Sequence, residues 1–167
     1  MVVKNIVDED FVNYKKPSMF IGCNTCTFKC GMDVCQNRNL IESPDIHVDD
    51  LSLVKRFCDN SLTKAIVFGG LEPLDDAYDI EIFLIYLRFW EKFKGLEFSD
   101  VVIYTGYTES EAWQRFPDFM KYLSKDPSCI MKFGRYEPGD KKHMDAVLGV
   151  YLSSQNQYAK VLSEQKK

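Results

Sequence analysis

The 167-residue sequence lacks a long hydrophobic run, an excess of basic charge and the pattern of a secretory leader. A membrane helix needs roughly 20 consecutive apolar residues, and no stretch of the chain approaches that length. The formal net charge of −4 provides no basic surface for nucleic acid or for anionic lipid. The first ten residues do not have the composition of a signal peptide. We therefore expect a cytoplasmic protein that binds neither nucleic acid nor membranes.

Internal repeats, low-complexity tracts and linkers are also missing, and histidine is scarce. The two histidines, His47 and His143, lie in polar segments that are more typical of surface loops than of metal ligands or catalytic bases. Hydrophobic residues make up 46% of the chain and charged residues 28%, as in soluble globular proteins. The length suits one domain with a substantial core, so we expect a single domain over residues 1–167.

What the chain does contain is a concentration of thiols, because four of its six cysteines fall between residues 23 and 35. In a reducing compartment such a cluster more often binds a metal than forms disulfides. An iron–sulfur cluster is favoured, since cluster ligands often come from one compact loop. A structural zinc held by all four thiolates is the alternative. The four residues are Cys23, Cys26, Cys30 and Cys35.

Short apolar runs alternate with helical stretches along the chain. The strand candidates are 18–22, 64–68, 101–105, 129–133, 147–152 and 158–162. The helix candidates are 51–58, 76–94 and a helix that begins at 108–111 and is interrupted at Pro117. Strands that are apolar on both faces and separated by helices indicate an α/β fold with a mostly parallel sheet covered by helices.

Three sequence features follow three of these strands directly. The cysteine loop follows 18–22, Gly69 and Gly70 follow 64–68, and Thr105 is the last residue of 101–105. Because the carboxyl ends of parallel strands meet at one edge of a sheet, we expect these features to face one pocket. Two glycines at a strand end let a ligand approach the backbone, and Glu72 could accept hydrogen bonds from a ligand's ammonium group. A tight turn before the next helix is the alternative explanation of 69–73.

Together, the cysteine loop and the stretch Gly69-Gly70-Leu71-Glu72-Pro73 resemble the radical S-adenosylmethionine (radical SAM) enzymes. The resemblance implies that Cys26, Cys30 and Cys35 bind a [4Fe-4S] cluster, with Cys23 left over. It also implies that the glycine-rich stretch holds the methionine part of SAM. This chain departs from the family in having C-x3-C-x4-C in place of C-x3-C-x2-C, and in the inserted leucine.

Residues 103–108, residues 153–157 and the chain length further resemble the activating enzymes of anaerobic ribonucleoside-triphosphate reductase, over roughly residues 17–162. That resemblance implies a partial (β/α) barrel of the radical SAM type. The stretch 132–135 is a departure, because these activases tend to carry an Asp-Gly pair there. The residues implied to lie near SAM are Gln36, Asn37, Gly69, Gly70, Glu72, Thr105 and Asn156.

The implied activity is reductive cleavage of SAM to a 5′-deoxyadenosyl radical, which installs a glycyl radical on an anaerobic ribonucleotide reductase. The implied electron donor is of the flavodoxin type, and no side chain of the activase need act as a general acid or base. Two alternatives stay open. One is a radical SAM enzyme that acts on another peptide or a small molecule, and the other is a binding module without catalysis that is stabilised by zinc or a cluster.

The helix predicted over 76–94 has an apolar arc much wider than the single stripe of an ordinary surface helix. Either a second layer of the protein covers this helix, or the helix meets a partner chain, which includes a homodimer. We favour the partner. The acids Asp75, Asp76 and Asp79 at its start are expected to be helix-start charges and not a metal site.

Overall fold

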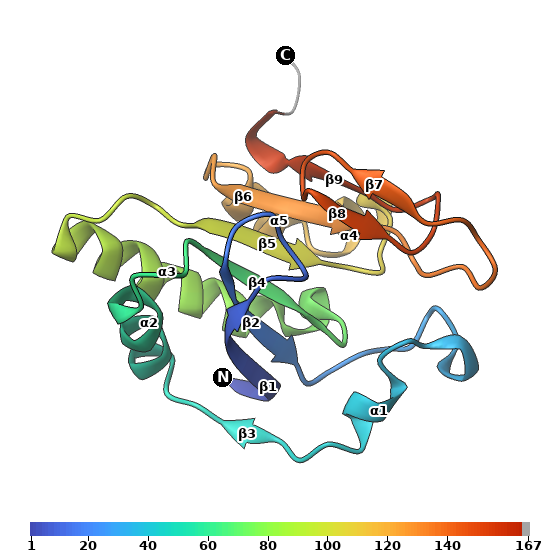
Figure 1. Cartoon of the computed structure of the whole chain (residues 1–167), viewed down its shortest axis with the longest axis horizontal. Helices are drawn as coiled ribbons and strands as arrows, with labels where there is room; N and C mark the ends of the chain where they lie inside the picture. The colour runs from blue at the N-terminus through green and yellow to red at the C-terminus, as the bar shows by residue number, and fades with distance from the viewer. Residues whose placement is uncertain (165–167) are drawn as a thin grey trace.

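A seven-stranded sheet runs through the computed structural model, which describes residues 1–164 (Figure 1). The central strands β2 (Ser18–Cys23), β4 (Ala65–Gly70), β5 (Asp100–Tyr104) and β6 (Cys129–Phe133) pair in parallel. The strands β1 (Val2–Asp10) and β3 (Ile46–His47) at one side and β9 (Tyr158–Val161) at the other are antiparallel. The protein therefore has an α/β fold with a mixed, largely parallel sheet, and within residues 1–164 the sheet does not close into a barrel. The spatial order of the strands is β3, β1, β2, β4, β5, β6 and β9.

Helices and one small hairpin make up the other regular elements. The hairpin consists of β7 (His143–Asp145) and β8 (Val150–Leu152). Short 3-10 helices span Met32–Val34 (η1), Pro73–Asp76 (η2) and Leu162–Glu164 (η3). The α-helices are α1 (Arg38–Ile41), α2 (Asp50–Asp59), α3 (Ala77–Lys94), α4 (Glu109–Arg115) and α5 (Pro117–Leu123). No helix within residues 1–164 combines the length and the apolar character that crossing a bilayer requires.

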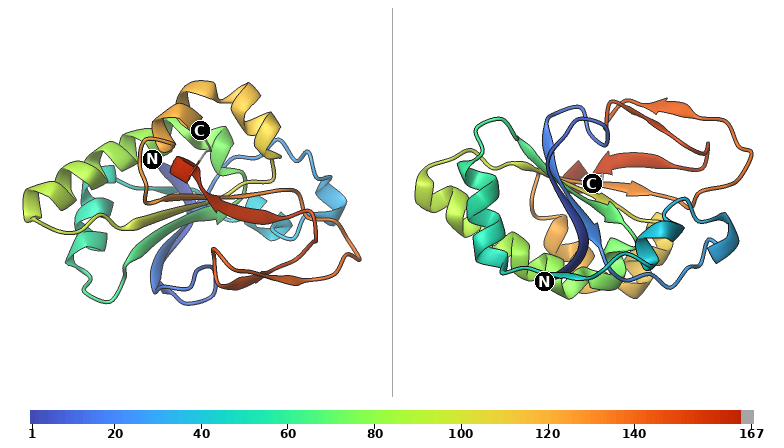
Figure 2. Two further views of the ribbon diagram at one scale, coloured as in Figure 1. Left: turned by 90° about the horizontal axis from the view of Figure 1, so that it is seen from above. Right: turned by 60° about the horizontal axis from the view of Figure 1, so that its bottom comes forward.

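The helices α2, α3, α4 and α5 cover one face of the sheet, as Figure 2 shows. Successive side chains of a strand point to opposite faces, so Ile66 and Phe68 of β4 join the core with the helices, while Ala65 and Val67 face the other way. The predicted covering by helices is thus confirmed for this face.

The second face is covered differently, by the segment that contains Tyr14 and by the β7–β8 hairpin. Tyr14, Leu148 and Leu152 pack there against the apolar side chains of β4, β5 and β6. The hairpin lies on the side of the sheet opposite the helices (Figure 2). Helices therefore do not cover this face, contrary to the expectation, and its thinner cover leaves a hollow near the carboxyl ends of the strands.

Most predicted elements are confirmed, with corrections at their ends. Gly69 and Gly70 are the last two residues of β4 and pair with β2, so they belong to the strand and do not follow it. The strand predicted over 147–152 shortens to Val150–Leu152, because Val147 to Gly149 form a turn whose amides bond to Asp145. The expectation missed β1, whose run of valine, lysine, asparagine and acids lacks the continuous apolar character of the parallel strands. Both histidines lie in short strands, β3 and β7, and not in loops.

Candidate functional site

A cavity of about 600 Å³ lies at the carboxyl ends of the parallel strands, on the face that helices do not cover. The loop after β2, the end of β4 and the end of β5 all contribute to its wall, as expected for parallel strands. Every predicted site residue except Asn156 lines it. These residues are Cys26, Cys30, Cys35, Gln36, Asn37, Gly69, Gly70, Glu72 and Thr105.

The three thiols of the loop are half-exposed at the cavity, whereas Cys23 is buried at the end of β2 with 2% of its surface accessible. Burial raises the pKa of Cys26 to about 11, and it also raises the pKa of Cys30. The Cys26 sulfur accepts a hydrogen bond of 3.2 Å from the Phe28 amide, in a turn that holds Phe28 at φ +49°. Cys23 thus differs from Cys26, Cys30 and Cys35 in being buried and in not lining the cavity.

The three thiols line one cavity, but they are not arranged as the ligands of a metal ion. Within residues 1–164, no group of three or more histidine, cysteine, aspartate or glutamate side chains is arranged to hold a metal ion. The chemistry of the donors suits a soft metal or an iron–sulfur cluster, because three cysteines of one loop face the same space.

Asn37 fixes the far end of the cysteine loop to the sheet. Its side-chain amide donates a hydrogen bond of 2.5 Å to the Gly70 carbonyl, at the end of β4. Gly70 has φ +81°, and a Cβ there would lie 3.1 Å from the Gly22 Cα atom and 3.2 Å from Leu40. A glycine is therefore required at this position by both its backbone conformation and the close approach of β2.

Glu72 is a buried carboxylate in the cavity wall, at the start of η2. One of its oxygens accepts hydrogen bonds from the Thr105 hydroxyl (2.6 Å) and the Leu74 amide (3.1 Å), and the other accepts one from the Gly106 amide (2.8 Å). Burial raises the pKa of Glu72 to about 7, although these three donors favour the ionised form. Glu72 therefore links the end of β4 to the end of β5 and offers a site for a cationic group.

The stretch 132–135, which departs from the activase pattern, forms part of the same wall. Lys132 is buried in β6, donates a hydrogen bond of 2.7 Å to the Gly134 carbonyl and lines the cavity. Burial lowers the pKa of Lys132 to about 8, and the negative charge of Glu72 opposes this shift. Arg135 also lines the cavity, with one guanidinium nitrogen 2.8 Å from each carboxylate oxygen of Glu111. A lysine inside an otherwise apolar strand was the signal in the sequence for this wall.

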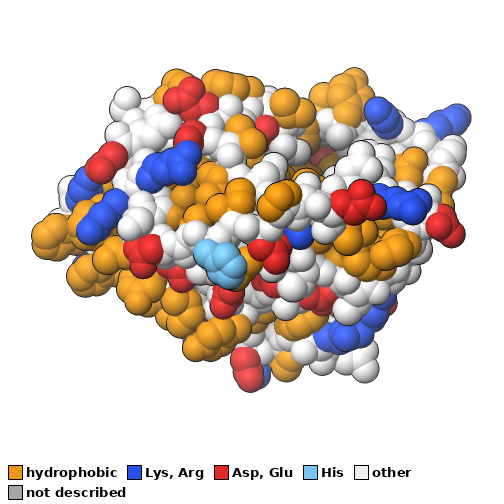
Figure 3. All heavy atoms as spheres, turned by 90° about the horizontal axis from the view of Figure 1, so that it is seen from below, with side chains coloured by type: hydrophobic (Ala, Val, Ile, Leu, Met, Phe, Trp, Pro, Cys, Tyr) orange, Lys and Arg blue, Asp and Glu red, His pale blue; other side chains and the backbone are white. Residues whose placement is uncertain are grey.

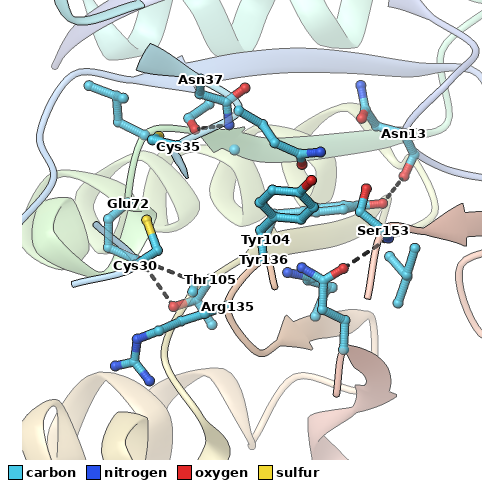
Figure 4. Close-up of a pocket in the computed structure, with 18 of the residues that line it drawn as sticks. Asn13, Cys30, Cys35, Asn37, Glu72, Tyr104, Thr105, Arg135, Tyr136 and Ser153 are labelled. Carbon is cyan, nitrogen blue, oxygen red and sulfur yellow. Dashed lines mark hydrogen bonds between the residues drawn. The ribbon is translucent and has the colours of Figure 1, made fainter. Parts of the chain in front are cut away.

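A second group of polar side chains lines the side of the cavity that faces the hairpin. In Figure 4, Cys30, Glu72 and Thr105 lie to one side, and Tyr104 and Ser153 lie to the other. The Tyr104 hydroxyl donates a hydrogen bond of 2.5 Å to the Asn13 carbonyl, and burial raises its pKa. This side was not predicted, because it belongs to the segment and the hairpin that cover the second face.

Asn156 lies outside the cavity lining, and its neighbour Gln157 lies in it. The Asn156 side chain is exposed and donates a hydrogen bond of 2.8 Å to Glu137. The Gln157 side-chain oxygen accepts hydrogen bonds from the amides of Ser153 (3.0 Å) and Ser154 (3.2 Å). Gln157, and not the predicted Asn156, therefore lines the cavity at this point.

Asp75 and Asp76 do more than place charge at the start of a helix. Asp75 accepts a hydrogen bond of 2.9 Å from the Thr27 amide and one of 2.8 Å from the Tyr107 hydroxyl. Asp76 accepts one of 2.5 Å from the Thr25 hydroxyl. Both carboxylates thus hold the beginning of the cysteine loop against η2, a role that helix-start composition alone did not reveal.

Comparisons of the chain with protein-family models, with curated proteins and with solved structures give no match. The arguments about function consequently depend on the residues and the geometry described above.

Proposed function

We propose that the protein is a radical SAM enzyme that binds a [4Fe-4S] cluster through Cys26, Cys30 and Cys35. The observation that carries the proposal is that these three thiols and the ends of β4 and β5 line one cavity, from which Cys23 is excluded. Three cysteine ligands leave one iron without a protein ligand, and SAM would bind that iron. The proposal includes the finer fold, in which the mixed sheet is a shortened, partial (β/α) barrel.

Binding of the cluster would require the three thiols to lose their protons and come together. Burial keeps the thiols of Cys26 and Cys30 protonated at neutral pH, so cluster formation would release protons. Both residues lie in a loop that has no strand or α-helix of its own between β2 and α1, so the loop can adjust without disturbing the sheet. The donor set and its place therefore fit the cluster.

The rest of the cavity fits a ligand of the size and polarity of SAM. The whole cavity, including the space that the three thiols line, has a volume of about 600 Å³, within the usual range for small-molecule sites. Glu72 would face the ammonium group of the methionine part, and a bound cation would stabilise its ionised form. Asn37 holds Gly70 in place, and Gln36, Gly69 and Thr105 complete the wall.

The chemistry supplied by a bound cluster would be reductive cleavage of SAM to a 5′-deoxyadenosyl radical, with an electron from a flavodoxin-type donor. The side chains of this protein would position SAM and exclude water, and none of them need transfer a proton. The proposed target of the radical is a backbone glycine of an anaerobic ribonucleotide reductase, the partner that the activase resemblance implies.

The test is anaerobic reconstitution with iron and sulfide, followed by a SAM-cleavage assay with a strong reductant. We expect 5′-deoxyadenosine from the wild type and its loss in Cys26→Ala, Cys30→Ala and Cys35→Ala. Cys58→Ala is the matched control, because Cys58 is a half-buried thiol in α2 away from the cavity.

Three outcomes would contradict the proposal. The first is no 5′-deoxyadenosine from reconstituted wild type, and the second is unchanged cleavage by Cys26→Ala. The third is zinc bound by all four thiols, Cys23 included, without SAM cleavage, which would favour a structural module. If SAM is cleaved but no glycyl radical appears on a co-encoded reductase, another peptide or small molecule is the substrate.

A further inference from the structure

The helix α3 exposes a continuous apolar stripe on the side that faces away from the sheet. Tyr78, Phe89 and Phe93 are 74%, 62% and 70% exposed. Figure 3 shows hydrophobic side chains gathered along the lower-left border of its view, on the side of the molecule where α3 lies. Within residues 1–164 no second layer covers them. We call the following residues the α3 stripe: Tyr78, Ile82, Ile85, Tyr86, Phe89 and Phe93.

The spacing of the α3 stripe is symmetric about the midpoint between Ile85 and Tyr86. Ile82 and Phe89 stand at equal distances on either side of that point, and so do Tyr78 and Phe93. At 3.6 residues per turn, all six positions fall within an arc of about 100° on the helix surface. A second copy related by a two-fold axis at this midpoint runs antiparallel and places Ile82 opposite Phe89 and Tyr78 opposite Phe93, so the two stripes meet along their whole length.

The charges beside the stripe have the matching arrangement. Glu81 and Lys92 lie along the same flank of the stripe, because eleven residues correspond to about three helical turns. Within residues 1–164 neither side chain takes part in an ion pair. The two-fold axis that pairs the stripe in antiparallel fashion would bring Glu81 of one copy toward Lys92 of the other. The charges of α3 are thus complementary to those of a second α3.

We propose that the α3 stripe is the interface of a homodimer, in which two α3 helices pack antiparallel around a two-fold axis near residues 85 and 86. The aromatic content of the stripe is that of a protein interface, since Tyr and Phe provide large contact areas at low cost in conformational entropy. Leu96 and Phe98 are also exposed, just beyond the end of α3. The thiol cavity lies on the opposite face of the sheet, so the dimer leaves it accessible.

The first experiment measures the mass of the full chain by light scattering and by sedimentation over a range of concentrations. We expect twice the mass of one chain, and a dimer weakened at least about tenfold in Phe89→Ser. Phe11→Ser is the matched control, because Phe11 is also 62% exposed but lies in the segment after β1. It should leave the dimer unchanged.

The second experiment tests the antiparallel register by charge reversal. Glu81→Lys and Lys92→Glu should each weaken the dimer, and the double variant should restore it. The proposal is overturned if the wild type is a monomer at every concentration, which would leave the stripe to a different partner. It is also overturned if Phe89→Ser leaves a dimer intact, or if the double charge reversal is no better than the two single variants.

Discussion

At the scale of single residues, the cavity wall depends on backbone conformations that only glycine adopts easily. Gly134 follows β6 with φ +99°, and a Cβ there would lie 2.8 Å from the Asn156 carbonyl oxygen and 3.2 Å from the Gln157 Cα atom. Both neighbours are backbone atoms, which cannot move aside cheaply. The carbonyl of Gly134 also accepts the hydrogen bonds of Lys132 and Gln157.

We predict that Gly134→Ala lowers the free energy of unfolding by about 1–3 kcal/mol, measured by urea denaturation. Gly139→Ala separates the two causes, because Gly139 has φ +81° but nothing within 4 Å of an added Cβ. Gly139→Ala should therefore lower the free energy of unfolding by a smaller amount, the part that comes from the backbone conformation alone. Equal losses in the two variants would show that the contact with Asn156 does not matter.

The site residues that could be predicted are those that follow a parallel strand directly. Cys26, Glu72 and Thr105 come shortly after the ends of β2, β4 and β5, so their positions at the cavity can be predicted from the sequence. The choice between Asn156 and Gln157 could not be made in this way, because adjacent residues point to opposite sides. Which of the two faces the cavity depends on the turn that the Gln157 side chain closes with two serine amides.

At the scale of secondary-structure elements, one partly buried arginine makes the polar contacts between α3 and the segments that precede β5 and β6. Arg88 donates hydrogen bonds to Glu91 (2.7 Å), to Asp126 (2.7 Å) and to the Ser99 carbonyl (3.1 Å). Glu91 is fully buried and also accepts the Ser99 amide at 2.9 Å. Arg88 thus connects α3 to the residues that lead into β5 and β6.

We predict that Arg88→Met lowers the free energy of unfolding by about 3–5 kcal/mol, because it leaves the Glu91 carboxylate buried without its cation. Arg56→Met is the control. Its ion pair with Asp8 is exposed, so it should change stability by less than about 1 kcal/mol in thermal or urea unfolding. If Arg88→Met is as mild as Arg56→Met, Arg88 does not hold the elements together.

The beginning of the cysteine loop is held by η2 through Asp75. Asp75→Asn replaces one accepting carboxylate oxygen with an NH2 group that can only donate. That group faces either the Thr27 amide or the Tyr107 hydroxyl. We expect the loss of about 1 kcal/mol of local stability, seen as roughly fivefold faster hydrogen exchange of the Thr27 amide. Asp79→Asn, in the first turn of α3, should not change that exchange. A global loss of protection instead of a local one would contradict the proposed role of Asp75.

At the scale of the whole molecule, the sheet has one face built for packing and one face that keeps space open. The parallel strands and the long helices were predictable, because apolar runs and helix caps mark them. The cover of the second face was not, because it comes from residues around Tyr14 and from a hairpin of two three-residue strands. Such short segments have too few residues for their periodicity to be seen, and only contact with the sheet defines them.

The burial of Glu72 in that open face gives the whole molecule a specific dependence on pH. The folded pKa of about 7 lies above the ordinary value of 4.5, so the folded protein binds the proton of Glu72 more tightly than the unfolded chain does. This contribution to stability is complete below pH 4.5 and is lost as the pH rises toward 7, with a total on the order of 3 kcal/mol. Urea unfolding at intervals between pH 4.5 and 7.5 measures it.

Glu72→Gln removes the titrating group, so the free energy of unfolding should fall less steeply with pH in this variant than in the wild type. Glu97→Gln, at an exposed glutamate after α3, should keep the slope of the wild type. The slopes are compared below pH 7, because the folded pKa of Lys132 is about 8 and Glu72→Gln removes a charge that raises it. Identical slopes in Glu72→Gln and the wild type would mean that the Glu72 carboxylate is hydrated in the cavity. Glu72 could then still face a cationic ligand, but without the added strength that a desolvated carboxylate provides.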